Sequence, residues 1–169
     1  MMSHTQSPVD IDSYLDVYDQ LRQATEGLSA EQLRWKASEK SWSIAEVLTH
    51  LADHNLVVSF RLREILSGST AKLPAFAQDP WVAGQKANEG QVEDTLELFR
   101  QLLLYNSRLF RRLEAEDWEK TGTNFKGETV TAAGIVKAFI AHAHHHLGQI
   151  DRIKRGETEA RNAGSGCAI

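Results

Sequence analysis

Four long stretches of the chain carry apolar residues at steps of three or four, and this helical periodicity constrains the fold more than any other feature. The clearest stretch begins at Ser43 and Glu46, which have the spacing of a capping box. Its apolar positions, before Gly68 ends it, are Ile44, Val47, Leu48, Leu51, Val58, Leu62 and Ile65. Comparable stretches cover residues 7–27, 92–113 and 131–155. We therefore predict an all-α fold, an antiparallel four-helix bundle.

The segments between these stretches predict shorter elements. Ser7 followed by Pro8 is typical of a helix N-cap and first helical position, so we expect the first helix to begin there. A serine at position 29 predicts one short helical turn over residues 29–33. Residues 68–90, rich in glycine and containing two prolines, predict the longest irregular segment. No segment shows a convincing strand pattern.

Composition narrows the class of protein. The 169 residues are 41% hydrophobic and 25% charged, with a net charge of −4, which is typical of one globular domain and shows no basic footprint for nucleic acid. We assign residues 1–156 to this domain and 157–169 to a flexible C-terminal tail that contains the single cysteine, Cys167. No apolar run is long enough for a membrane span, and no signal peptide is evident. We expect a cytoplasmic protein.

Four of the seven histidines fall within residues 142–146, inside the fourth predicted helix. Residues four apart share a helix face, so His142 and His146 lie together on the apolar stripe, whereas His144 and His145 point elsewhere. Two imidazoles one turn apart can bind one metal ion. The glutamate that serves as general base in zinc proteases with this spacing is absent here.

His50 is the best candidate for a third ligand, because it lies within the apolar stripe of the second predicted helix. His54, one turn further on, could replace it or support it from outside the ligand set. Three neutral imidazoles suit zinc, nickel or another borderline divalent ion, and they leave coordination positions open for water or substrate. The alternative is that these residues are ordinary core histidines.

Two segments together resemble the DinB-like superfamily, which includes proteins of the YfiT type classed as metal-dependent hydrolases and bacterial thiol S-transferases. The first, Ser41–Asp53, matches a Trp-Ser-x-x-Glu-x-x-x-His pattern with Trp42, Ser43, Glu46 and His50. The second, His142–Ile150, matches a His-x-x-x-His pair followed by Gln149. The resemblance implies a four-helix bundle with one metal ion, often zinc or nickel, on His50, His142 and His146, and frequently a homodimer.

The resemblance also implies a range of activities. Some relatives activate a bacterial low-molecular-weight thiol such as bacillithiol or mycothiol, and one group isomerises maleylpyruvate. We therefore expect a metal-dependent enzyme in which the ion activates a thiol or a water molecule, resembling a thiol S-transferase or a hydrolase acting on a small-molecule substrate. A non-catalytic metal-binding dimer with a regulatory or stress-response role is the alternative. Asp53 and Gln149 are possible contributors to the site, and Phe76 and Trp81 could wall a substrate pocket.

Overall fold

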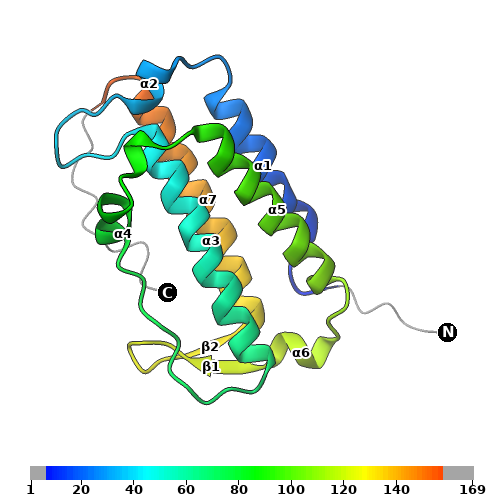
Figure 1. Ribbon diagram of the computed structural model, residues 1–169. Helices are drawn as coiled ribbons and strands as arrows, with labels where there is room; N and C mark the ends of the chain where they lie inside the picture. Colours follow the sequence, from blue (N-terminus) through cyan, green and yellow to red (C-terminus); the bar gives the residue numbers. More distant parts are fainter. Residues whose placement is uncertain (1–6, 158–169) are drawn as a thin grey trace.

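The computed structural model describes residues 7–157, and the predicted four-helix bundle is confirmed (Figure 1). Its long helices are α1 (Ile11–Thr25), α3 (Ile44–Leu66), α5 (Val92–Phe110) and α7 (Ala132–Lys154). Shorter elements join them: α2 (Ala30–Arg34), α4 (Gln78–Gly84), η1 (Ala87–Glu89), α6 (Ala115–Glu119), β1 (Thr121–Thr123) and β2 (Thr129–Thr131). The predicted tail lies outside the described residues apart from Glu157, as does Cys167.

The helices are not arranged in the order of the sequence. The main contacts of α3 are with α5 and α7, and those of α1 are with the same two helices, so α1 lies diagonally opposite α3, and α5 lies diagonally opposite α7. Figure 1 shows α3 running antiparallel to α7 but in the same direction as α5. The segment 67–91 must therefore return along the length of the bundle, which is why this connection is so long. Helices α3 and α7, which carry the predicted ligands, are neighbours.

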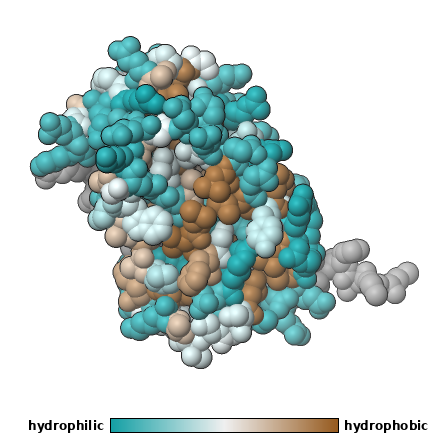
Figure 2. All heavy atoms as spheres, viewed as in Figure 1, coloured by the Kyte–Doolittle hydropathy of each residue, from teal (hydrophilic) through white to brown (hydrophobic). Residues whose placement is uncertain are grey.

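The core is centred on α3 and α7, whose inward positions are almost completely buried. Val47, Leu51 and Phe139 have essentially no exposed surface. The outer face of α3 and α5 is different, because Leu56, Phe60, Leu98 and Tyr105 are exposed large side chains. Figure 2 shows apolar surface gathered over the middle of this face.

Helix starts were predicted well where a side chain caps the backbone. Ser43 and Glu46 form both bonds of the capping box at α3, and Ser29 caps α2. The prediction for α1 was wrong: its N-cap is Asp10, whose carboxylate accepts a hydrogen bond from the amide of Ser13 at 3.0 Å. Ser7 instead accepts a hydrogen bond from the amide of Val9, before the helix begins.

The prediction of an irregular segment over residues 68–90 was partly wrong, since α4 and η1 lie within it. Pro80 is compatible with α4 because it occupies the first turn, where the backbone amide has no helical partner to lose. We found no convincing strand pattern in the sequence, and the expectation that no strand forms was also wrong. Strands β1 and β2 form a short antiparallel hairpin that pairs Thr121 with Thr131 and Thr123 with Thr129.

Within residues 7–157, no helix combines the length and the apolar character that crossing a membrane would require.

Candidate metal centre

His50 lies in the second turn of α3, and the start of that helix is firmly set. The Ser43 hydroxyl accepts a hydrogen bond from the amide of Glu46 at 3.1 Å, while the Glu46 carboxylate accepts from the amide of Ser43 at 3.0 Å. The same carboxylate lies 3.2 Å from the ammonium of Lys36. These contacts fix the rotation of α3, so that His50 faces α7 with no exposed surface.

His142 and His146 lie one turn apart on the inner face of α7. Each side chain is only 5% exposed, and the same face buries Phe139 and Ile150 completely. His144 and His145 are exposed, as the helical periodicity predicted. The helix therefore sorts its four clustered histidines into two that face α3 and two that face outward.

The three buried imidazoles point their Nε2 atoms at one another. The Nε2 atom of His142 lies 3.3 Å from that of His50 and 3.0 Å from that of His146. A single ion bound at zinc–nitrogen distances in tetrahedral geometry would separate its ligand nitrogens by about 3.3 Å. A neutral Nε2 can instead donate or accept a proton, but one proton cannot bridge three atoms. The chemistry of this donor set fits one divalent ion.

The protonation state also fits. Burial is the main cause that lowers the pKa of His50 to about 2, that of His142 to about 3 and that of His146 to about 4. Neighbouring imidazoles contribute to each shift, and the hydrogen bond to Gln149 partly offsets the shift of His146. All three rings are therefore neutral near pH 7. A neutral imidazole keeps the lone pair that a metal ion requires, so no proton has to be displaced from a charged ring before binding.

Gln149 sets the tautomer of His146. Its side-chain oxygen lies 2.5 Å from Nδ1 of His146 and accepts the proton there. When Nδ1 carries the proton, Nε2 bears the lone pair, and Nε2 is the atom directed at His142. Hydrogen bonds of this kind orient metal-binding histidines in proteins. Gln149 is itself buried, in agreement with its predicted place on the inner stripe of α7.

Comparison with known proteins agrees with the fold. The model of the DinB superfamily matches residues 14–150. This chain belongs to the DinB superfamily. The matched range begins within α1 and ends within α7, so it includes all four long helices and all three clustered imidazoles.

Individual relatives are distant but align over most of their length. A protein of Oceanobacillus iheyensis named "Putative metal-dependent hydrolase OB0413" is 26% identical over 78% of this chain and 76% of its own. The solved structure of YfiT from Bacillus subtilis, described as a probable metal-dependent hydrolase with an unusual four-helix bundle topology, has a TM-score of 0.82. It is 22% identical, and the match covers 94% of this chain and 92% of that one.

A second solved structure, the mycothiol-dependent maleylpyruvate isomerase, has a TM-score of 0.65 at 11% identity. That match covers 84% of this chain and 61% of the isomerase. At such low identity the likeness concerns the helical fold. The DinB fold of this chain is thus shared with proteins described by quite different reactions.

Aromatic side chains cover the imidazoles in this DinB protein. The ring of Phe76 stacks on His50 with centroids 5.6 Å apart and planes 3° apart, and Trp42 lies 4.9 Å from the same ring. Trp81 meets Phe76 edge-on at 5.1 Å but is itself partly exposed. Phe76 therefore walls the site directly, whereas Trp81 supports it from outside. The contact of Trp42 with His50 went unpredicted, because Trp42 lies before the N-cap of α3 and helical periodicity does not place it.

Asp53, a possible contributor to the site, is buried. The side chain is only 7% exposed, and its carboxylate accepts a hydrogen bond from Nε2 of Gln85 at 2.6 Å. Burial raises the pKa of this carboxyl, and the bond from Gln85 partly offsets the shift. Among residues 7–157 the group that can share an ion consists of the three histidines without Asp53. The sequence offered no signal for Gln85, because this contact depends on how α4 packs against α3.

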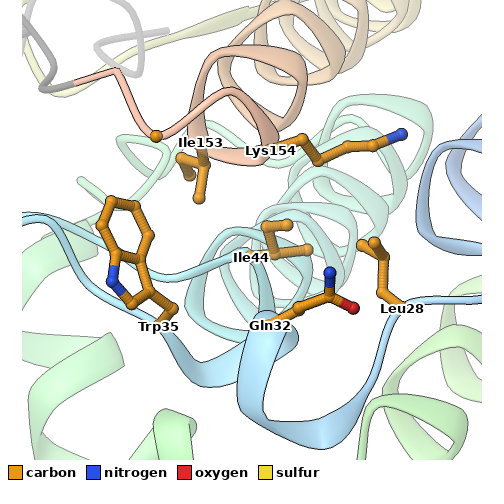
Figure 3. Close-up of a pocket in the computed structure, with 7 residues that line it drawn as sticks. Leu28, Gln32, Trp35, Ile44, Ile153 and Lys154 are labelled. Atoms are coloured by element: carbon orange, nitrogen blue, oxygen red, sulfur yellow. The ribbon is translucent and has the colours of Figure 1, made fainter.

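Figure 3 shows a separate pocket of about 160 Å³ where α2, the start of α3 and the end of α7 meet. Its lining is mainly apolar and comprises Leu28, Gln32, Trp35, Ile44, Ile153, Lys154 and Gly156. Lys154 is the charged residue in this lining, and none of the clustered histidines contributes to it. The pocket therefore lacks the donors that distinguish the candidate metal centre.

Proposed function

We propose that this chain is a metal-dependent enzyme that binds one divalent ion, zinc or nickel, through His50, His142 and His146. The observation that carries the proposal is the convergence of three buried, neutral imidazoles. The Nε2 atoms of His50 and His146 both lie within 3.3 Å of Nε2 of His142. Three neutral nitrogens from two helices provide the donor set for a borderline ion and leave room for a further, non-protein ligand. The family's relatives named as metal-dependent hydrolases support this assignment.

Such an ion would keep its full positive charge and would lower the pKa of a thiol or water molecule bound to it. The chain's own residues prepare the site for this. Gln149 holds the proton on Nδ1 of His146, while Phe76 and Trp42 keep bulk water away from His50. In a site of low dielectric constant, the charge would act strongly on a small molecule beside it.

Our leading hypothesis is transfer or activation of a low-molecular-weight thiol. The structural likeness to a mycothiol-dependent isomerase supports it, and neutral nitrogen ligands suit a thiolate partner. Hydrolysis by an activated water molecule is the second hypothesis, and it is favoured by the names of the sequence relatives. Both reactions need the same three imidazoles.

The experiment starts from protein purified without a nickel column, with metal content measured per chain. We expect close to one divalent ion per chain. Turnover is then assayed with bacillithiol, mycothiol and glutathione against a simple carbon electrophile, and in parallel with a panel of esters. Thiol consumption that depends on the ion supports the first hypothesis. Ester hydrolysis without any thiol product would replace it with the second.

A non-catalytic role would show a different result. A protein that merely holds the ion would contain it stoichiometrically yet turn over neither thiols nor esters. The chain would then be a metal-binding dimer of regulatory or stress-response type. We propose a homodimer in either case, and the exposed apolar side chains on α3 and α5, with Phe60 54% exposed, offer a surface for it. Light scattering of the purified protein, with Phe60→Asp as the disrupting variant, measures this.

A further inference from the structure

His54 is a buried polar side chain next to the candidate metal centre that the three-histidine proposal does not use. It has no exposed surface, yet neither of its ring nitrogens has a hydrogen-bond partner among residues 7–157. Leaving a buried polar group unsatisfied costs about 1–3 kcal/mol, so native proteins rarely keep one without a use for it. A partner that is not part of the polypeptide would remove this cost.

The position of His54 places such a partner beside the metal centre. The ring centroid of His54 lies 4.1 Å from that of His142 and 6.2 Å from that of His50. Its ring stacks against Phe139 at 5.7 Å and Phe76 at 6.0 Å. These aromatic neighbours hold the imidazole in place without offering it a conventional hydrogen bond. A molecule that reached the metal centre could therefore meet His54.

A cationic side chain lies on the same face of α3 as His54. Arg61 follows two turns further along the helix and is buried. Burial lowers the pKa of His54, and the neighbouring imidazoles and the charge of Arg61 contribute to the shift. The guanidinium donates from Nε and Nη2 to the carbonyl oxygen of Pro74 at 3.2 and 2.7 Å. Those bonds hold the segment that carries Phe76. An imidazole ring has at least one N–H to give to a negatively charged acceptor, whichever tautomer it adopts.

The carboxylate closest to His54 in the sequence does not make this region unfavourable for an anion. Asp53 precedes His54, but its carboxylate is directed to Gln85 and is absent from the group of residues that can share an ion. Three neutral imidazoles would also leave the charge of a divalent ion uncompensated by the protein. The inner part of the site is therefore suited to an anion.

We propose that His54 is a binding residue of this site, which donates a hydrogen bond to a carboxylate-type oxygen of the small molecule, with Arg61 supplying the attracting charge. The substrate or cosubstrate is accordingly an anion. This inference rests on the proposed function, because it requires a ligand at the metal centre. It extends that function by assigning a substrate class and a residue that selects for it.

The test uses the full chain loaded with cobalt(II), whose near-ultraviolet charge-transfer band reports a bound thiolate. Mercaptoacetate and 3-mercaptopropionate are titrated in comparison with their neutral amides, so that the paired probes differ in the carboxylate. We expect each carboxylate probe with sufficient reach to bind at least tenfold more tightly than its amide, the range for a hydrogen bond to a charged group. His54→Leu should remove most of this preference, while His54→Asn, which keeps a donor, should retain part of it.

His144→Leu is the matched control, since it removes an exposed histidine from α7 and should leave the preference unchanged. Cobalt content should stay at one per chain in all three variants, because His54 is outside the ligand set. Equal binding of acid and amide by the unsubstituted protein would overturn the inference alone, as would a preference that persists in His54→Leu. Failure of the unsubstituted protein to bind cobalt would instead overturn the proposed function, and this inference with it.

Folding stability provides a readout that does not depend on the metal. In the metal-free protein, His54→Leu should raise the midpoint of urea unfolding, because the substitution removes two unsatisfied ring nitrogens from the core. A clear loss of stability would show that the polypeptide or an internal water molecule already satisfies His54. That result would also overturn the assignment of the ring to a ligand.

Discussion

The bundle contains two buried polar clusters that differ in how their hydrogen bonds are completed. In the cluster of α1, α3 and α5, the Asn106 amide donates to the Tyr14 hydroxyl at 3.1 Å and to the Ser59 hydroxyl at 2.8 Å, while its oxygen accepts from Arg63 at 3.0 Å. In the cluster of α3 and α7, three imidazole Nε2 atoms converge on one another. The first cluster pairs its own polar groups, whereas the second, in our proposal, is completed by a bound metal ion.

The difference separates a polar group that serves the fold from one that serves a ligand. A buried network whose members pair with each other helps to specify one packing of the helices. A buried group whose nitrogen lone pairs point at one another gains its full stabilisation only when a cation binds them. The two clusters should therefore respond in opposite ways to acid, to truncation and to metal, and each response can be measured.

The largest effect should come from acid acting on the metal-free protein. The folded pKa values of His50, His142 and His146, about 2, 3 and 4, lie below the unfolded value near 6.5. Between about pH 4 and 6.5 the unfolded chain therefore binds more protons, and folding stability falls as the pH falls through this window. Together, the three histidines lower the free energy of unfolding by up to about 4 kcal/mol for each unit by which the pH falls. Above pH 6.5 all three are neutral in both states, and the full stability is present.

Urea unfolding of chelator-treated protein, followed by circular dichroism at intervals from pH 7.5 to 5, measures this slope. His142→Leu should reduce it by up to one proton, about 1.4 kcal/mol per pH unit. Asn106 itself carries no proton that titrates, so Asn106→Leu should lower the free energy of unfolding at every pH without changing its dependence on pH. A flat stability profile between pH 6.5 and 5 in the original protein would contradict the account of three buried neutral rings.

The next effect is the loss of one candidate ligand. His142→Ala should weaken zinc binding on the order of 1,000-fold, because the binding free energy of a structural zinc site corresponds to about 3–4 kcal/mol per protein ligand. Competition with a chromophoric chelator measures the affinity. The metal-free variant should remain folded, because the substitution removes only one of the three Nε2 atoms that converge on one another. A zinc affinity within tenfold of the original would remove His142 from the ligand set.

Truncation in the other cluster should give the reverse result. Asn106→Leu leaves the Tyr14 hydroxyl, the Ser59 hydroxyl and the Arg63 guanidinium without their shared partner, and should destabilise the fold by about 3 kcal/mol. Zinc affinity should stay within about threefold. Thermal unfolding and the chelator competition, run on the same preparation, separate the two effects. A large loss of zinc affinity with unchanged stability would show that the two clusters are not independent.

The sequence predicted the elements that local chemistry determines. Helix α3 could be assigned because the Ser43–Glu46 capping box and the apolar stripe are both local signals. The pairing of His142 with His146 also follows from helix geometry alone. The inclusion of His50 required more, because α3 and α7 become neighbours only through the order in which four helices pack. The residue pattern made His50 the best third candidate and left His54 as an alternative, and the resemblance to the DinB-like superfamily then selected His50.

What the sequence could not predict depends on segments that pack across the helices. Phe76 reaches His50 because Arg61 binds the carbonyl of Pro74, a contact across thirteen residues with no local signature. Aspartate is usually exposed, but Gln85 of the returning segment donates a hydrogen bond to the buried Asp53, and no local pattern indicates this contact. The start of α1 was misassigned because Ser7 and Asp10 are both good caps and only the chain's path selects between them.

The smallest effect should come from Gln149, which contacts a candidate ligand without being one. Replacing it with leucine removes the acceptor for Nδ1–H of His146 while keeping a side chain of similar size on a buried helix face. Zinc affinity should fall 10–100-fold, the range for such supporting hydrogen bonds, without loss of the one-to-one stoichiometry. Gln149→Glu retains the acceptor and should keep affinity close to the original value. If both variants bind zinc as tightly as the unsubstituted chain, His146 does not need its tautomer set from outside, and the convergence of Nε2 atoms must be enforced by helix packing alone.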